Sequence, residues 1–161
     1  YGHKIGDLVL QQVARLLERV GRTSDTTTRW GGEEFLLVGR NLKPKEAYRW
    51  AARICEAFRS TEFTTDSGQV LSCGCSVGFA FYPFVSNSPR AVRWQDVVSI
   101  ADEALYAAKN SGRDQWVGLL STSQTPNEFN TEALREKLPG LLQEKKLDVL
   151  SERDSAELKW S

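Results

Sequence analysis

Arg29-Trp-Gly-Gly-Glu-Glu-Phe35 is the stretch of this chain that says most about its fold and its function. Residues that favour β-structure flank the two glycines, three threonines before them and a Leu-Leu-Val run after them. This pattern predicts a β-hairpin with a two-residue turn at Gly31 and Gly32, because such turns need the positive φ that glycine adopts at little steric cost. The glycines also leave bare backbone at the tip, which a phosphate or a purine could approach closely.

Two acidic residues, Glu33 and Glu34, follow the glycines directly. Adjacent carboxylates repel each other unless a cation or a donor-rich ligand neutralises them. An acidic hairpin tip with solvated glutamates is the alternative, since short motifs recur by chance. The stretch resembles the Gly-Gly-(Asp/Glu)-Glu-Phe signature of the GGDEF domain, the diguanylate cyclases of bacterial signalling, and further matches at compatible spacing favour that family.

The first further match is Tyr1-Gly-His-Lys-Ile-Gly-Asp7, which resembles the family's Gly-His-x-x-Gly-Asp segment. It opens a predicted amphipathic helix. The resemblance implies that Asp7 accepts hydrogen bonds from the guanine edge, where adjacent N–H donors suit a carboxylate. Alternatively, Asp7 stabilises the helix N-terminus through the macrodipole, and both roles can hold. The apolar stripe of this helix comprises Ile5, Leu8, Val9, Val13, Leu16, Leu17 and Val20.

A second match is the predicted helix around Ala101–Lys109, with Gly112 as its terminator. Lys109 and Arg113 are four residues apart, so they would emerge together near the helix end if the last turn holds. The resemblance implies that these two cations grip the triphosphate. Taken alone, cations at a helix C-terminus usually compensate the helix dipole.

A third match is Arg22-Thr-Ser-Asp25, which precedes the Gly-Gly turn. It resembles the Arg-x-x-Asp inhibitory site at which many family members bind their own product, cyclic di-GMP. Arginine suits guanine because its fork addresses O6 and N7 together, and aspartate suits the N–H edge. Arg53, on the following predicted helix, falls where the family often places a second product-binding arginine. Solvated surface charge is the alternative for all three residues.

Composition limits the other classes of function. The 161 residues fit one domain plus a tail, and 21 Lys and Arg balance 21 Asp and Glu, which argues against nucleic acid or an anionic membrane as partner. The sequence has no run long enough to span a membrane and no secretory signal. Three cysteines, Cys55, Cys73 and Cys75, favour reduced thiols in a cytoplasmic protein, and with a single histidine they do not predict a metal site.

The remaining patterns predict an α+β fold. Helices alternate with mostly antiparallel strands, and Pro44 marks the start of one helix. A hairpin is expected over 62–75, a strand over 76–82 with small residues on one face, a polar loop over 84–93 and a last strand over 115–119. The order resembles the family's ferredoxin-like, adenylyl-cyclase-type palm.

The predicted domains are a GGDEF-like domain over 1–119 and a tail or linker with short helices over 120–161. Pro139-Gly140 is expected to separate two helix-capable segments of the tail, 131–138 and 141–150. Residues 146–150 are alternatively a strand that substitutes for a missing one. The family's first strand, with its metal-binding Asp and the Asn that follows it, has no counterpart here. The chain is therefore expected to be an N-terminally truncated fragment with weak or no activity of its own.

The resemblance implies a reaction in which two GTP molecules form cyclic di-GMP and pyrophosphate across a homodimer. It implies that Glu33 holds Mg²⁺ or Mn²⁺, that Glu34 supports metal or base chemistry, and that Gly31 and Gly32 let the nucleotide approach. It also implies an upstream sensory or receiver domain in the parent protein. The alternative function is a non-catalytic sensor that binds cyclic di-GMP.

Overall fold

The computed structural model describes residues 3–126, 129, 131–132 and 134–160. Tyr1 and Gly2, which begin the segment that leads to Asp7, lie outside the described residues, and so does Ala133 in the predicted helix over 131–138. The chain forms two compact units, residues 1–75 and 76–161.

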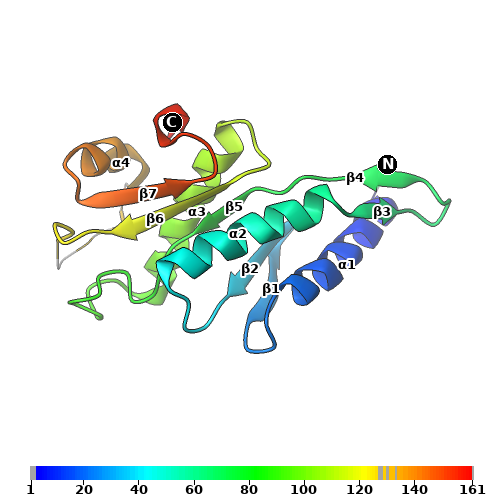
Figure 1. Cartoon of the computed structure of the whole chain (residues 1–161), viewed down its shortest axis with the longest axis horizontal. Helices are drawn as coiled ribbons and strands as arrows, with labels where there is room; N and C mark the ends of the chain where they lie inside the picture. The colour runs from blue at the N-terminus through cyan, green and yellow to red at the C-terminus, as the bar shows by residue number, and fades with distance from the viewer. Residues whose placement is uncertain (1–2, 127–128, 130, 133, 161) are drawn as a thin grey trace. The chain divides into compact units, whose positions relative to one another are not determined.

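The first unit contains two helices and two short antiparallel hairpins. Its elements are α1 (His3–Val20), β1 (Thr26–Gly31), β2 (Glu34–Val38), α2 (Pro44–Arg59), β3 (Glu62–Thr64) and β4 (Val70–Ser72). Helices α1 and α2 lie side by side, and α1 also packs on β1 and β3 (Figure 1).

The core of the first unit lies between these two helices and the β3–β4 hairpin. Only part of the predicted apolar stripe of α1 belongs to this core. Val13, Leu16 and Leu17 are buried, while the stripe residues nearer the N-terminus are half-buried. Phe63 of β3 is completely buried, and its ring centroid lies 6.0 Å from that of Phe58. Helix α2 buries Ala47, Ala51, Ile54, Cys55 and Phe58, as its apolar spacing predicts.

The second unit is a three-stranded sheet with helices packed on it. Its elements are β5 (Val77–Phe79), α3 (Trp94–Asn110), β6 (Trp116–Ser121), α4 (Leu134–Gln143), β7 (Leu147–Ser151) and η1 (Ser155–Glu157). Strand β5 pairs with β6 in parallel, because α3 forms the crossover between them, and β6 pairs with β7 antiparallel (Figure 1). The fold is α+β, and β5–β6 is the one parallel pair among the described strands.

Gly78 shows why the strand over 76–82 has small residues on one face. A Cβ atom at Gly78 would lie 2.2 Å from the carbonyl oxygen of Ala101 and 2.3 Å from the backbone nitrogen of Leu105. The glycine therefore lets the backbone of α3 lie directly against the sheet, which confirms the predicted close approach of a helix.

The segment after position 120 is part of the core of the second unit. Leu138 and Leu147 from this segment are buried together with Ile100 and Val117. The described part of the tail or linker expected there thus contains α4, β7 and η1, and its leucines pack against the core of the second unit. The whole buried cluster comprises Phe84, Val85, Val92, Val97, Ile100, Ala104, Ala108, Val117, Leu119, Phe129, Leu134, Leu138, Leu147 and Leu158.

Pro139 does not end a helix, and this corrects the prediction of two segments separated at Pro139-Gly140. Helix α4 runs through Pro139, since the buried side chains of Leu134 and Leu138 hold the turns that precede it against the core. The helix ends instead at Gln143, and Lys145, two residues later, has a φ of 55° and occupies the left-handed position that closes many helices. The following residues form β7, the strand that the sequence offered as an alternative to a helix.

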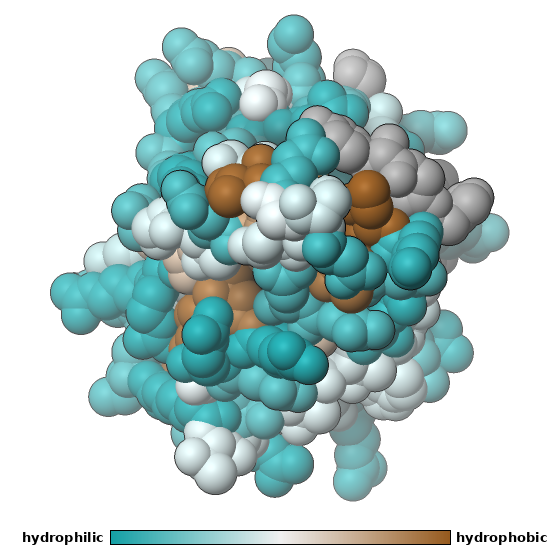
Figure 2. All heavy atoms as spheres, turned by 90° about the vertical axis from the view of Figure 1, so that its right-hand side faces the viewer, coloured by the Kyte–Doolittle hydropathy of each residue, from teal (hydrophilic) through white to brown (hydrophobic). Residues whose placement is uncertain are grey.

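Among the described helices, none combines the length and the apolar character that a bilayer span requires. On the face that Figure 2 shows, hydrophilic residues predominate and apolar residues form separate small patches. Cys55 is buried, Cys73 and Cys75 are partly buried, and none of these three cysteines is in a disulfide.

Candidate nucleotide site

The hairpin of the signature is present, but its turn lies one residue later than predicted. Gly31 pairs with Glu34, so the two turn residues are Gly32 and Glu33 rather than the two glycines. The strand register shifts between Arg29 and Gly31, which places an extra residue in β1 before the turn. Gly32 has a φ of 52°, and it is the residue of this hairpin that needs the conformational freedom of glycine.

Arg29 holds the turn in shape. Its Nε and Nη2 atoms both donate to the carbonyl oxygen of Gly32, at 2.9 and 2.8 Å. Sequence reasoning did not predict this contact, although an arginine three residues before the turn glycine is within reach of such a carbonyl. The contact fixes the backbone that presents Glu33.

The two acidic residues of the signature are exposed at this tip. Glu33 lies in the turn and Glu34 is the first residue of β2. No group of three or more His, Cys, Asp or Glu side chains in the described part of the chain could hold a metal ion. Adjacent carboxylates nevertheless fit Mg²⁺, because this ion is commonly bound through one or two carboxylates together with substrate phosphates and water.

Asp7 lies exposed on α1, away from the buried residues Val13, Leu16 and Leu17. It is the fifth residue of the helix as described, and α1 has no acidic residue in its first turn. Because the helix dipole acts mainly within the first turn, Asp7 is expected to contribute little to dipole compensation from this position.

Lys109 and Arg113 belong to the second unit and do not share a continuous helix. Helix α3 ends at Asn110, and the N–H of Arg113 donates to the carbonyl oxygen of Ala108 at 3.1 Å. With Gly112 at a φ of 104°, this bond closes the helix in a Schellman motif. The sequence predicts that Lys109 and Arg113 emerge together on condition that the last helical turn includes both, and this condition is not met. The predicted role of Gly112 as helix terminator is confirmed.

Arg153, from the segment after β7, lies against the same loop. Its Nη1 atom donates to the carbonyl oxygen of Ser111 at 3.1 Å, and its Nη2 atom donates to that of Arg113 at 3.4 Å. A guanidinium at these carbonyls compensates the negative end of α3. Sequence reasoning missed Arg153 because it lies forty residues after the loop that it contacts.

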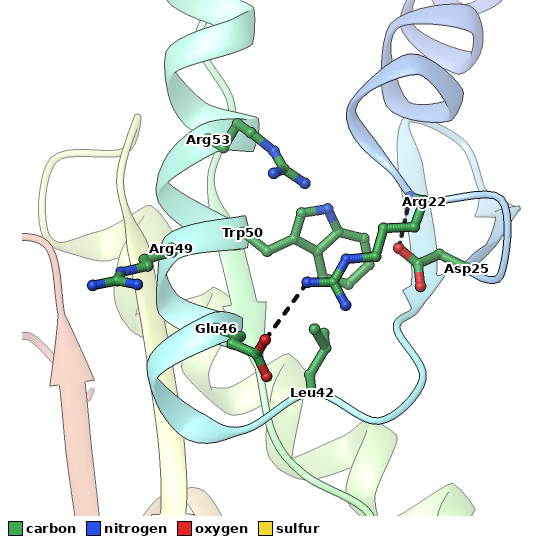
Figure 3. A pocket seen from close by; sticks show the side chains of 7 residues that line it. All are labelled: Arg22, Asp25, Leu42, Glu46, Arg49, Trp50 and Arg53. Carbon is green, nitrogen blue, oxygen red and sulfur yellow. Dashed lines mark hydrogen bonds and ion pairs between the residues drawn. The ribbon is translucent and has the colours of Figure 1, made fainter.

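Arg22, Asp25 and Arg53 line one pocket of the first unit, which has a volume of about 200 Å³ (Figure 3). Asp25 accepts a hydrogen bond from the backbone N–H of Arg22 at 2.8 Å, which closes the loop between α1 and β1. Arg53 Nη2 donates to the carbonyl oxygen of Val20 at 2.8 Å, so α2 is tied to the end of α1. The structure thus brings together three residues that the sequence assigned to product binding.

The other residues of the pocket were not predicted. Glu46, Arg49, Trp50 and Arg53 follow the i, i+3, i+4, i+7 spacing of one helix face, a signal that the sequence contains. Trp50, expected in the buried stripe, is half-buried and lines the pocket instead. Its indole packs on Gly39, where a Cβ atom would lie 2.6 Å from Trp50 Cζ3.

Glu46 forms an ion pair with Arg22 inside this pocket. Its Oε1 atom lies 3.8 Å from Nη2 of Arg22, and its Oε2 atom accepts from the backbone N–H of Lys43 at 2.9 Å (Figure 3). The hydrogen bond from Lys43, together with the positive charges of Arg22 and Lys43, lowers the pKa of the Glu46 carboxyl below its ordinary value. Glu46 is therefore ionised at neutral pH.

The chain belongs to the GGDEF domain family. Residues 1–115 match the family described as "Diguanylate cyclase, GGDEF domain". Diguanylate cyclase A of Treponema denticola is 34% identical over 115 residues, which cover 71% of this chain and 29% of that protein. Diguanylate cyclase DosC of Escherichia coli K12 is 32% identical over 115 residues, 71% of this chain and 24% of that protein. The chain thus spans about a quarter to a third of the length of these curated relatives.

Solved structures agree with this assignment. The GGDEF domain of TpbB, also named YfiN, from Pseudomonas aeruginosa is 30% identical, with a TM-score of 0.59 over 70% of this chain and 63% of that one. Diguanylate cyclase SiaD from the same organism, solved with its activator SiaC, is 33% identical, with a TM-score of 0.60 over 71% of this chain and 41% of that one.

Proposed function

We propose that this chain supplies the cyclase domain of a diguanylate cyclase, which joins two GTP molecules into cyclic di-GMP. The observation that carries the proposal is the signature hairpin. Its turn has Gly32 in the conformation that glycine favours, it is clamped by Arg29, and it presents two exposed carboxylates. Relatives of about one-third identity that are named diguanylate cyclases support the same activity.

In this proposal the residues around the hairpin tip bind the nucleotide and the metal. Gly31 and Gly32 leave open space, since a Cβ atom at either would meet nothing within 4 Å. Glu33 holds Mg²⁺ or Mn²⁺ together with the GTP phosphates, Glu34 supports the metal or accepts a proton, and Asp7 accepts hydrogen bonds from guanine. When bound, the metal neutralises the triphosphate and favours ionisation of the attacking hydroxyl.

Lys109 and Arg113 bind phosphate oxygens in this proposal. Arg113 is exposed on the loop after α3, which the Schellman motif and Arg153 hold in place. Positive charge matters because phosphoryl transfer depends mainly on positioning and on neutralisation of the developing charge. Removing one such charge contact is expected to cost on the order of 2–4 kcal/mol of transition-state stabilisation.

The reaction requires two copies of the domain. The 3′-hydroxyl oxygen of each GTP attacks the α-phosphorus of the other, a new P–O bond forms, and the bond to pyrophosphate breaks. Each hydroxyl loses its proton, so two GTP molecules yield cyclic di-GMP and two pyrophosphates. Because the two attacks are equivalent, a two-fold homodimer is the arrangement that suits them.

The pocket around Arg22 is proposed to bind cyclic di-GMP as an inhibitor. Its lining has three arginines and two carboxylates, a net charge of +1 that suits an anionic ligand. A volume of about 200 Å³ is below the roughly 300–1,000 Å³ of pockets that enclose a whole drug-sized ligand. We therefore expect the pocket to take one part of the cyclic dinucleotide and leave the rest exposed.

GTP turnover with Mg²⁺ tests the enzymatic proposal. The chain and an N-terminally extended form of it are incubated with GTP, and cyclic di-GMP is quantified by chromatography. The expected result is product formation that Glu33→Ala abolishes and that the exposed-site control Glu136→Ala leaves unchanged. Cyclic di-GMP no higher than in the Glu33→Ala variant, for both forms of the chain, would contradict the proposal.

A non-catalytic sensor of cyclic di-GMP is the second candidate. The observation that favours it is that the pocket is lined by residues of the first unit that are separate from those proposed to bind GTP and the metal. Calorimetry with cyclic di-GMP would then show binding without any GTP turnover. Equal affinity in the wild type and in Arg22→Ala would count against this pocket as the binding site.

A further inference from the structure

Three charged side chains of the Arg22 pocket, those of Arg22, Asp25 and Arg53, have partners within the protein. Asp25 accepts from the backbone N–H of Arg22, and Arg53 donates to the backbone carbonyl of Val20. These contacts are made to backbone atoms, so they orient the two side chains without adding a charge. The partner of the Arg22 guanidinium is different, because it is the charged side chain of Glu46.

Glu46 is placed so that its carboxylate stays beside Arg22. It is the third residue of α2, and its Oε2 atom is fixed by the N–H of Lys43, which leaves Oε1 facing Arg22 (Figure 3). Both side chains are partly exposed, at 52% for Arg22 and 41% for Glu46, so an incoming anion can reach the pair. The lowered pKa of Glu46 means that the negative charge is present throughout the neutral range.

We infer that Glu46 is a built-in competitor for the ligand of this pocket, which occupies Arg22 and thereby weakens the binding of cyclic di-GMP. The inference rests on the proposed product site and names Glu46 as the residue that sets its affinity. A phosphate or a guanine carbonyl that binds Arg22 has to displace the carboxylate, and it also meets the repulsion of that charge. Without Glu46 the net charge of the lining would rise from +1 to +2.

The size of the effect follows from the exposure of the pair. Because solvent screens an exposed ion pair, its loss changes an equilibrium constant by only about 1.4- to fivefold. Repulsion between Glu46 and a ligand with two negative charges acts in the same direction. We therefore expect removal of the charge to tighten binding about two- to fivefold at low salt, with a smaller gain at high salt.

Glu46→Gln is the variant that isolates the charge. The amide oxygen of glutamine can still accept from the N–H of Lys43, so the start of α2 keeps its hydrogen bond. Glu56→Gln is the matched control, because Glu56 lies on the same helix, is 72% exposed and pairs with Arg59 outside the pocket. Circular dichroism and thermal melting confirm that both variants fold like the wild type.

Isothermal titration calorimetry with cyclic di-GMP is carried out on the full chain at 50 and 300 mM salt. The expected result is tighter binding for Glu46→Gln by about two- to fivefold, an unchanged affinity for Glu56→Gln, and weaker binding for Arg22→Ala. If the wild type gives no heat but Glu46→Gln binds, the competitor role is also supported.

Three results would overturn the inference. One is an affinity of Glu46→Gln equal to or below that of the wild type while Arg22→Ala loses binding, which would leave the product site intact. Another is an equal gain in affinity for Glu46→Gln and Glu56→Gln, which would indicate an effect of the net charge of the protein rather than of Glu46 in the pocket. The third is no binding by any of the proteins, which would remove the product site together with its competitor.

Discussion

The two units of this chain differ in where their informative residues lie. In the first unit three of the residues with a proposed function, Arg22, Glu33 and Glu34, are exposed. In the second unit the residues that form the core are buried, and Ile100, Val117, Leu119 and Leu138 are fully inaccessible, whereas Arg113 lies exposed on the loop after α3.

This difference shows that exposed polar residues and buried apolar residues carry different information in the sequence. Exposed polar residues are not needed for packing, so a short string such as the signature points directly to chemistry. Buried apolar residues of the second unit carry no such string, and only the structure shows that the segment after position 120 belongs to the core.

The largest expected effect tests whether the C-terminal segment is integral to the second unit. Leu138→Ala removes a fully buried side chain, and leucine-to-alanine changes in cores cost about 2–5 kcal/mol. Urea unfolding should therefore show a much lower midpoint. Glu136→Ala, exposed on the same helix, should change the free energy of unfolding by less than about 0.5 kcal/mol. Similar stability of the two variants would mean that α4 does not hold the core together.

A smaller effect is expected where backbone packs on backbone. Gly78→Ala places a Cβ atom 2.2 Å from the carbonyl oxygen of Ala101, and overpacking of this kind costs about 1–3 kcal/mol. Gly140→Ala is the matched control, since a Cβ atom there meets nothing within 4 Å and alanine favours the helix by about 1 kcal/mol. In thermal melting, the midpoint should be lower than that of the wild type for Gly78→Ala and higher for Gly140→Ala. A Gly78→Ala protein as stable as the wild type would show that α3 can move away from the sheet.

The smallest expected effect is a pH dependence of the folding stability, which involves Asp96 of the second unit. The bidentate hydrogen bonds from Arg93, at 2.8 and 3.1 Å, and a further one from Thr131 lower the pKa of Asp96. A carboxyl whose pKa is lower in the folded state contributes stability above its unfolded pKa, near 4, and loses it as pH falls through the folded value.

Asp96→Asn should therefore destabilise the protein at pH 7 by about 0.2–1 kcal/mol, because Arg93 is mostly exposed. The difference from the wild type should shrink as the pH of urea unfolding is lowered from 5 to 2.5. Glu136→Gln provides the control for loss of one charge. A difference that stays constant over this range would show that the ion pair adds nothing.

Much of the fold could be predicted because local patterns agreed with the final packing. Pro44 begins α2, the apolar spacing of α2 gives its buried face, and the small residues around Gly78 allow a helix to approach. Pro139 misled the prediction, because burial of Leu134 and Leu138 outweighs the lost backbone hydrogen bond of a proline.

The local geometry of the candidate site could be predicted only in part. The turn at Gly32 lies one residue later than expected because the strand register shifts after Arg29, which no local propensity indicates. The ion pair of Glu46 with Arg22 joins the first turn of α2 to the loop after α1, twenty-four residues away, so it depends on how two helices pack.

Binding of GTP tests the central claim most directly, namely that Glu33 of the signature hairpin and Lys109 of α3 each contribute to nucleotide binding. The affinity for GTP with Mg²⁺ is measured by calorimetry for the wild type, Glu33→Ala, Lys109→Ala and the exposed-site control Lys137→Ala. The account predicts a loss of about tenfold or more, about 1.4 kcal/mol, in each of the first two variants and none in the control. Unchanged affinity in either Glu33→Ala or Lys109→Ala would contradict it.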